Sequence, residues 1–178
     1  NFAEDTLTQV DVVNGTFSTI ETAAESPTRI TTDAHGILVL HQSLVEESVI
    51  LTRYNAGGQF AASITVEGFP TAMLSDGVGL WIAVREAESG SLTQYDAATL
   101  AERWRVEAAP INDLILTANG LWSADFANDT VTQRSPQTGA VLNVYPAGDL
   151  PQALAADNGL LWVLNRRAGS VRRLWIGA

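Results

Sequence analysis

The sequence of 178 residues contains no cysteine, which excludes disulfides, thiolate metal sites and a cysteine nucleophile. It contains no lysine either, and its ten arginines stand against twenty acidic residues, for a formal net charge of −10. Phosphate backbones are bound by clustered cations, so we expect no nucleic-acid partner. No apolar run approaches the roughly 20 residues that span a bilayer, so we expect no transmembrane segment.

Histidine, the usual general base near neutral pH, occurs only at His35 and His41. Six residues of extended strand separate them by about 20 Å, too far to share one metal ion or proton. The sequence contains no oxygen-rich calcium loop, no Gly-x-Ser-x-Gly motif and no phosphate-binding glycine loop. The sequence therefore predicts no catalytic residue, no metal ligand and no cofactor.

The remaining composition is that of an ordinary globular protein. Hydrophobic residues make up 46% of the chain and charged residues 17%, and the length suffices for one sizeable core. Because the chain starts at Asn1, we expect a processed form or a piece of a longer protein. The compartment stays open, and we favour an extracytoplasmic or secreted location.

The main positive signal is an internal repeat of about 40 residues. Gly-Leu-Trp-type strands place Trp81, Trp122 and Trp162 at intervals of 41 and 40 residues, and "AHGILVL" is a fourth copy. A second motif recurs as "LTQVD", "LTRYN", "LTQYD", "VTQRS" and "VRRLW". A proline precedes each repeat at Pro27, Pro70, Pro110 and Pro151. Three independent markers thus share one period.

Each repeat divides into four segments of strand length, and no segment keeps a helical apolar period. In the second repeat these segments are "TAMLS", "GLWIAV", "SLTQYD" and "AERWRVEA". Glycines such as Gly36 and Gly120 follow the first segment and supply the positive φ of a tight hairpin. The repeat therefore predicts a four-stranded antiparallel meander.

Tandem meanders of this length are typical of an all-β fold, the β-propeller, in which each sheet is one blade and neighbouring blades pack face to face. In "LWIAV" both alternating faces are apolar, as expected where each face meets another sheet. We therefore interpret Trp81, Trp122 and Trp162 as core between blades. The alternative is a stacking platform for a sugar or nucleobase.

The stretch "DTVTQRSPQTGAVLNVYPAGDLPQALAADNGLLWVLNRRAGSVRRL" resembles the repeat of the YVTN-type β-propellers. It is similar also to the streptogramin-lyase and NHL-type propeller repeats. The resemblance covers nearly the whole chain and implies a propeller scaffold, whose function it leaves open. The streptogramin-lyase type relies on a His/Glu cluster, and no residue of this sequence matches those catalytic positions.

We expect residues 1–178 to form a single β-propeller domain or an arc of one, with about four and a half blades. The expected repeats span about 1–26 (partial blade), 27–68, 69–108, 109–148 and 149–178 (partial blade). In one arrangement a four-bladed ring closes when "TFSTIETA" docks beside "SVRRLW", which leaves "LTQVDVV" redundant. In the other, which we favour, the chain is an arc of a larger propeller.

The loops between second and third strands should lie on one rim with the loops that join blades. These loops differ in charge, and Glu46, Glu47 and Glu88 make two of them acidic. Such differences are expected of a recognition surface, but neutral sequence drift in solvent-exposed loops also produces them. Arginines cluster in "NRRAGSVRRLW", where they could meet an acidic partner or protect an edge strand. The possible rim or partner contacts are Arg85, Asp125, Asn128, Arg166, Arg167, Arg172 and Arg173.

These observations favour a non-catalytic propeller scaffold or recognition module that binds a protein or small ligand on its loop rim. We expect a protein partner, or a second chain that completes the propeller. The alternative is a propeller lyase or hydrolase with a metal ion held by carboxylates in the central channel.

Overall fold

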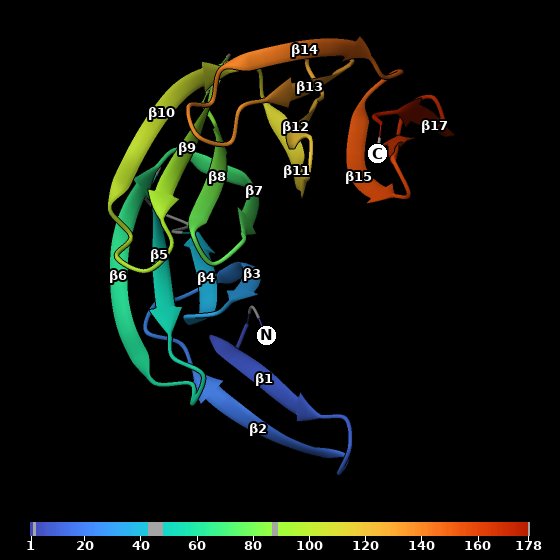
Figure 1. Ribbon diagram of the computed structural model, residues 1–178. Coiled ribbons are helices and arrows are strands. Elements are labelled where there is room, and N and C mark those ends of the chain that lie inside the picture. The colour runs from blue at the N-terminus through green and yellow to red at the C-terminus, as the bar shows by residue number, and fades with distance from the viewer. Residues whose placement is uncertain (2, 43–47, 87–88, 178) are drawn as a thin grey trace. The chain divides into compact units, whose positions relative to one another are not determined.

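A computed structural model describes residues 1, 3–42, 48–86 and 89–177, and every regular element in these ranges is a β-strand (Figure 1). The described part of the chain offers no helical segment with the length and hydrophobicity of a membrane span. The fold is therefore all-β, as the repeat predicts.

The strands form one two-stranded sheet, three four-stranded sheets and one three-stranded sheet. The two-stranded sheet contains β1 (Thr6–Asp11) and β2 (Thr16–Glu21). The second sheet contains β3 (Pro27–Asp33), β4 (Gly36–Gln42), β5 (Ser48–Tyr54) and β6 (Phe60–Glu67). The third contains β7 (Phe69–Ser75), β8 (Gly79–Arg85), β9 (Gly90–Asp96) and β10 (Glu102–Ala108). The fourth contains β11 (Ile111–Thr117), β12 (Gly120–Asp125), β13 (Thr130–Arg134) and β14 (Val141–Pro146). The three-stranded sheet contains β15 (Pro151–Asp157), β16 (Leu160–Asn165) and β17 (Ser170–Trp175).

Every sheet follows chain order, and each strand pairs with its sequence neighbour, so each sheet is a meander. The tight turn between first and second strands depends on glycine. Gly36 has a φ of +126° and Gly120 one of +135°, and a Cβ atom at Gly120 would come within 2.9 Å of the Arg134 carbonyl oxygen. These turns confirm the predicted hairpins.

The chain divides into two compact units. The first contains Asn1–Phe69 and Ser75–Gly77, and the second contains Pro70–Leu74 and Val78–Ala178. In the first unit, the Tyr54 hydroxyl accepts a hydrogen bond from the Ala23 amide at 2.6 Å, which ties the segment after β2 to β5. Leu38, Val39 and Leu40 of β4 have no exposed surface, so β4 is the centre of its core.

The second unit is stabilised by apolar clusters between consecutive sheets. Trp81 of β8 is 2% exposed and belongs to a cluster that joins two sheets. The buried members of this cluster are Ala72, Trp81, Ala83 and Leu92 from the sheet β7–β10, and Ile111, Leu114 and Leu121 from the sheet β11–β14.

The same arrangement recurs one repeat later. Trp122 of β12 is 1% exposed and packs in a cluster with Leu161 and Val163 of β16. Leu154, Ala156 and Tyr145 border this cluster, and the Tyr145 ring centroid lies 5.7 Å from that of Trp122. The interpretation of Trp81 and Trp122 as core between blades is thus confirmed.

We predict that Trp122→Ala lowers the free energy of unfolding by about 3–5 kcal/mol, because it removes a large buried side chain and leaves a cavity. It also removes the hydrogen bond from the Trp122 indole nitrogen to Thr117 Oγ1, 3.1 Å long. Trp162→Ala, at the matching position of the last sheet, is the control and should cost far less, since Trp162 is 39% exposed. Urea unfolding measures both, and equal losses would contradict the packing described.

Candidate interaction surfaces

In the second unit, the loops between second and third strands lie beside the loops that join sheets. Asp129, in the β12–β13 loop, accepts a hydrogen bond from the Leu150 amide at 2.8 Å. The Arg166 amide, at the end of β16, donates to the Leu150 carbonyl oxygen at 2.9 Å. An exposed ion pair of 3.2 Å joins Arg167 and Asp149. These contacts place both kinds of loop on one rim, as the sequence predicts.

The structure separates the seven predicted contact residues into exposed and buried. Six of them are exposed: Arg85, Asn128, Arg166, Arg167, Arg172 and Arg173. Asp125 is only 2% exposed and hydrogen-bonds to the Thr132 hydroxyl. Burial raises the pKa of Asp125, although its hydrogen bonds and the charge of Arg134 act in the opposite direction. Asp125 therefore presents no carboxylate on the rim. Glu46, Glu47 and Glu88 lie outside the described residues.

Asp125 belongs to a set of buried polar side chains at the end of the second strand. His41 and Asn165 occupy the same repeat position, and each is at most 2% exposed. His41 Nε2 lies 2.8 Å from Thr52 Oγ1, and Asn165 Nδ2 donates to the Ala147 carbonyl oxygen at 3.4 Å. Burial lowers the pKa of His41. The sequence analysis did not predict this set. Asp125 and Asn165 each lie three residues after the tryptophan of their repeat, and this spacing could have indicated a shared position.

His35 directly precedes β4, whereas His41 lies near the other end of this strand. The two histidines are therefore separated along the strand, as the sequence predicts. His35 Nε2 instead lies 3.0 Å from the Gly77 carbonyl oxygen. Across the described ranges, no group of three or more His, Asp or Glu side chains is placed to hold a metal ion.

The last sheet exposes one apolar face, which we call the C-terminal face: Trp162 and Leu164 of β16 with Val171, Arg173 and Trp175 of β17. Trp162 is 39% and Trp175 70% exposed. The Arg173 guanidinium carbon lies 5.8 Å from the Trp162 ring centroid, in a cation–π contact. The predicted burial of Trp162 is therefore wrong, because no further sheet among the described residues covers the face that β12 buries around Trp122.

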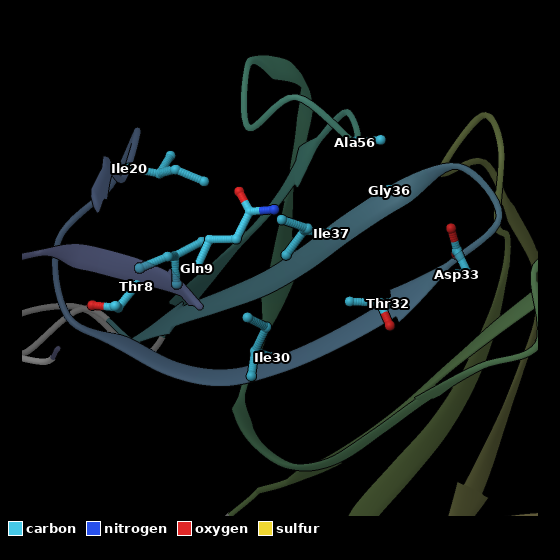
Figure 2. A pocket seen from close by; sticks show the side chains of 10 residues that line it. Thr8, Gln9, Ile20, Ile30, Thr32, Asp33, Gly36, Ile37 and Ala56 are labelled. Carbon is cyan, nitrogen blue, oxygen red and sulfur yellow. The ribbon is translucent and has the colours of Figure 1, made fainter. Parts of the chain in front are cut away.

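In the first unit, a cavity of about 350 Å³ opens between β1, β2, β3 and β4 (Figure 2). We call it the N-terminal groove, and its main lining residues are Leu7, Gln9, Ile20, Ile30, Thr32 and Ile37. Ile30 is 59% exposed. Figure 2 shows Gln9 extending toward Ile37, with Ile30 on the strand below. The lining is mostly apolar, so the groove suits an apolar side chain better than an ion.

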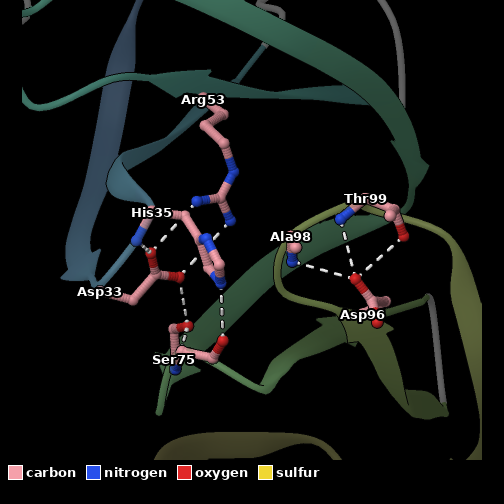
Figure 3. Close-up of polar contacts among 8 residues, drawn as sticks. Asp33, His35, Arg53, Ser75, Asp96, Ala98 and Thr99 are labelled. Atoms are coloured by element: carbon pink, nitrogen blue, oxygen red, sulfur yellow. Dashed lines mark hydrogen bonds and ion pairs between the residues drawn. The ribbon is translucent and has the colours of Figure 1, made fainter.

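Next to this groove lies a buried ion pair (Figure 3). The Asp33 carboxylate has no exposed surface and accepts hydrogen bonds from Arg53 Nη1 at 3.1 Å and Ser75 Oγ at 2.7 Å. It also accepts a hydrogen bond from the His35 amide at 2.8 Å, so Asp33 caps the turn between β3 and β4. Burial alone would raise the pKa of Asp33, but the bonds from Arg53, Ser75 and His35 outweigh it and lower the pKa.

Figure 3 also shows Asp96, the last residue of β9, which accepts hydrogen bonds from the backbone amides of Ala98 and Thr99 at 3.0 and 2.8 Å. The amide of Thr99 is the main cause that lowers the pKa of Asp96, followed by the bond from Arg103. Both carboxylates of Figure 3 are held in the ionised form by these contacts.

No model of a known protein family matches this sequence, and no curated protein matches it. Solved structures match its fold. The computationally designed Ika4 protein is 14% identical, with a TM-score of 0.71, over 89% of this chain and 96% of that one. The structure of the nidogen/laminin complex is 14% identical, with a TM-score of 0.71, over 98% of this chain and 69% of that one. Hydrazine synthase from Kuenenia stuttgartiensis is 10% identical, with a TM-score of 0.75, over 96% of this chain and 65% of that one.

The chain thus spans about two thirds of the length of these two natural structures. These neighbours are β-propeller-like proteins. At 10% to 14% identity the likeness concerns the fold alone. The chain has an all-β, β-propeller fold of four-stranded antiparallel blades of about 40 residues.

We predict that the Asp33–Arg53 pair makes stability depend on pH. Since the pKa of Asp33 is lowered in the folded state, the unfolded chain takes up the proton at a higher pH than the folded chain does. The contribution of Asp33 to stability is therefore fully present above about pH 5 and is lost as the pH falls through the folded-state pKa. Asp33→Asn should be less stable at pH 7 by about 3–5 kcal/mol, since Arg53 stays buried beside a neutral partner. It should also lose less stability on acidification.

The matched control is Asp157→Asn, at the same repeat position but exposed, where the change should be within about 0.5 kcal/mol. Urea unfolding at pH 7, 5 and 3 measures all three proteins. If Asp33→Asn and the unmodified chain lost stability in parallel on acidification, Asp33 would not be the titrating group.

Proposed function

We propose that this chain is a non-catalytic β-propeller module, of the YVTN type, that binds a protein partner through its C-terminal face and the adjoining arginine loop. The observation that carries this proposal is the exposure of Trp162 and Trp175 on a face whose counterparts around Trp81 and Trp122 are buried. We also propose that residues 1–178 form a single propeller domain or an arc of one, with the repeat boundaries that the sequence predicts.

An exposed apolar face of this kind is unfavourable in a protein that stays alone in water. Apolar surface contributes roughly 25 cal/mol for each Å² removed from water, so two indoles and two aliphatic side chains favour a covering partner. Contiguous exposed apolar patches mark interaction sites in soluble proteins. The flat sheet face has the form of a protein contact, whereas a small ligand is usually enclosed in a cleft.

The arginines beside this face give the partner a chemical character. Arg166, Arg167, Arg172 and Arg173 are exposed at one end of a chain whose formal net charge is −10. Arginine and tryptophan are the residue types most enriched at the energetic centres of interfaces. The partner surface is therefore acidic around an apolar centre, and its association should weaken as salt concentration rises.

Similar propellers agree with an interaction role without specifying it. Nidogen was solved in a complex with laminin, whereas hydrazine synthase is named as an enzyme. The same fold thus serves both classes, and the function has to be argued from the surface of this chain.

We predict that a photo-crosslinking amino acid at Leu164 captures a protein partner in the native source. Leu164 lies on the C-terminal face and is 44% exposed. The same amino acid at Val144, which is similarly exposed on β14, is the matched control and should capture nothing specific. Charge reversal by Arg172→Glu and Arg173→Glu should reduce the yield at Leu164. Equal capture from both positions, or none from Leu164, would refute a docking role for this face.

No group of three or more His, Asp or Glu side chains among the described residues is placed to hold a metal ion, so we predict that a chelator leaves the thermal unfolding temperature unchanged. Metal analysis of the purified protein should find less than one divalent ion per chain. A stoichiometric ion whose removal lowers the unfolding temperature would instead support the lyase or hydrolase alternative.

A further inference from the structure

We propose that His41 and Asp125 are two opposed pH sensors, each built into the joint through which the chain enters a sheet. A joint consists of the segment that leads into a sheet, the first residue of its first strand and the end of its second strand. Acid loosens the joint at His41 and tightens the joint at Asp125, whereas Asn165 makes the third joint insensitive to pH. This inference goes beyond the proposed function and is independent of the C-terminal face.

The three joints share one backbone geometry. In each, the polar residue pairs with the first residue of the first strand: His41 with Pro27, Asp125 with Ile111, and Asn165 with Pro151. The register shifts directly after this pair in all three first strands, so a β-bulge marks the point of entry. The three side chains therefore lie at one repeated structural position.

A backbone hydrogen bond closes each joint beside its polar side chain. The amide after the polar residue donates to a carbonyl oxygen of the entering segment: Gln42 to Ser26 at 3.0 Å, Phe126 to Pro110 at 3.1 Å, and Arg166 to Leu150 at 2.9 Å. Opening of a joint exposes this amide to exchange with water. Each joint thus contains its own reporter.

Each of the three side chains is buried with one polar atom that makes no hydrogen bond. His41 and Asp125 are each 2% exposed and Asn165 is 1% exposed. The atoms without a partner are His41 Nδ1, Asp125 Oδ1 and Asn165 Oδ1. Such burial is costly for a polar group and far more costly for a charged one. The closed joint therefore favours a deprotonated imidazole at His41 and a protonated carboxyl at Asp125, while the amide of Asn165 has no charge to lose.

The immediate neighbours of His41 on its sheet are uncharged. Across the strands it pairs with Pro27 of β3 and Ile50 of β5, and its Nε2 lies 2.8 Å from Thr52 Oγ1. A negative charge reaches it from Asp5, in the segment before β1. Asp5 favours the protonated ring, so it opposes the effect of burial without removing it.

The direction of the His41 response follows from these surroundings. Burial lowers the pKa of His41 and outweighs the backbone of Glu25 and Ala24 and the charge of Asp5, which raise it. An open joint therefore takes up the proton at a higher pH than a closed joint does. The stability of this joint is fully present above about pH 7 and is lost as the pH falls from about 6.5 toward the lowered pKa.

Asp125 responds in the opposite direction. Burial is the largest influence and raises its pKa, against the hydrogen bonds from Thr132 and Ser123 and the charge of Arg134. The Arg134 guanidinium donates to the Gly139 carbonyl oxygen at 3.3 Å. With a raised folded-state pKa, the closed joint binds the proton more readily than the open joint. Its stability is fully present below about pH 3.9 and is lost as the pH rises through the raised pKa.

The two sensors lie in different units of the chain. The joint of His41 belongs to the first unit and connects the sheet β1–β2 to the sheet β3–β6, whereas the joint of Asp125 belongs to the second unit. Mild acid therefore loosens the first unit at one defined point, while the second unit keeps its entry into the sheet β11–β14 closed.

The test is amide hydrogen exchange followed residue by residue by NMR at pH 7.5, 6.5, 5.5 and 5.0. This range stays above the sequence pI of about 4.4 and above the range in which Asp33 should titrate. Rates are expressed as protection factors, which removes the pH dependence of chemical exchange itself.

The three reporter amides should respond differently. From pH 7.5 to 5.5 the protection of Gln42 should fall by up to about tenfold, because an imidazole of ordinary pKa is about nine-tenths protonated at pH 5.5. The protection of Phe126 should rise by about twofold or more at pH 5.0. The protection of Arg166, beside Asn165, should stay constant.

Two variants remove one sensor each, and a third is the matched control. His41→Gln keeps an uncharged polar side chain and should abolish the response of Gln42 alone. Asp125→Asn introduces the amide that the third joint already contains and should abolish the response of Phe126 alone. His35→Gln removes the other histidine and should leave both responses unchanged. If a variant does not fold, NMR titration of the side chain in the unmodified protein decides, with a midpoint below about 6.5 for His41 and above about 3.9 for Asp125.

Protection of Gln42 that stays constant or rises in acid overturns the inference, and so does protection of Phe126 that fails to rise. Equal responses at all three amides, or responses that persist in His41→Gln and Asp125→Asn, overturn it as well, since the pH dependence then arises elsewhere. These results leave the docking role of the C-terminal face untouched, and a failed crosslink at Leu164 leaves the two sensors untouched.

Discussion

A four-stranded sheet with apolar side chains on both faces must be covered twice, and this requirement governs the structure. The second strand of each repeat has the pattern Leu-Trp-x-Ala or an equivalent, so it presents large side chains to both neighbours. Within the second unit, the sheets β7–β10 and β11–β14 each bury the tryptophan of their second strand against the sheet that follows, as the burial of Trp81 and Trp122 shows. The last sheet keeps the same residues, and among the described residues no further sheet covers its outer face, so Trp162 and Trp175 are exposed.

Polar side chains inside the sheets serve the same packing. Asp33 and Arg53 lie on different strands of one sheet, and their ion pair leaves neither charge exposed to water. The polar residues at the end of the second strand reach threonines of the third strand, as His41 does with Thr52 and Asp125 with Thr132. Such pairs are satisfied only in one strand register, because a slip by one residue would turn each side chain to the opposite face. They therefore favour the register of the meander.

Much of this architecture could be predicted because it is local and repeated. Strand lengths and hairpin glycines follow from residues within one repeat, and the period follows from comparing the repeats. The Arg53 partner was not, since it depends on the register between β3, β4 and β5. Asp125 was expected in a loop, whereas β12 extends to include it and buries it. Trp162 has the same local pattern as Trp122, so only the presence or absence of the next sheet distinguishes a core residue from an exposed one.

Repetition also creates a problem of specificity, since every blade presents nearly the same apolar surface and an open face could accept any of them. The charges of this chain act against that promiscuity. Four of its ten arginines lie at the end that carries the C-terminal face, whereas the first 26 residues are purely acidic in their charged side chains. Two C-terminal faces that approach each other bring like charges together, and so do two N-terminal grooves.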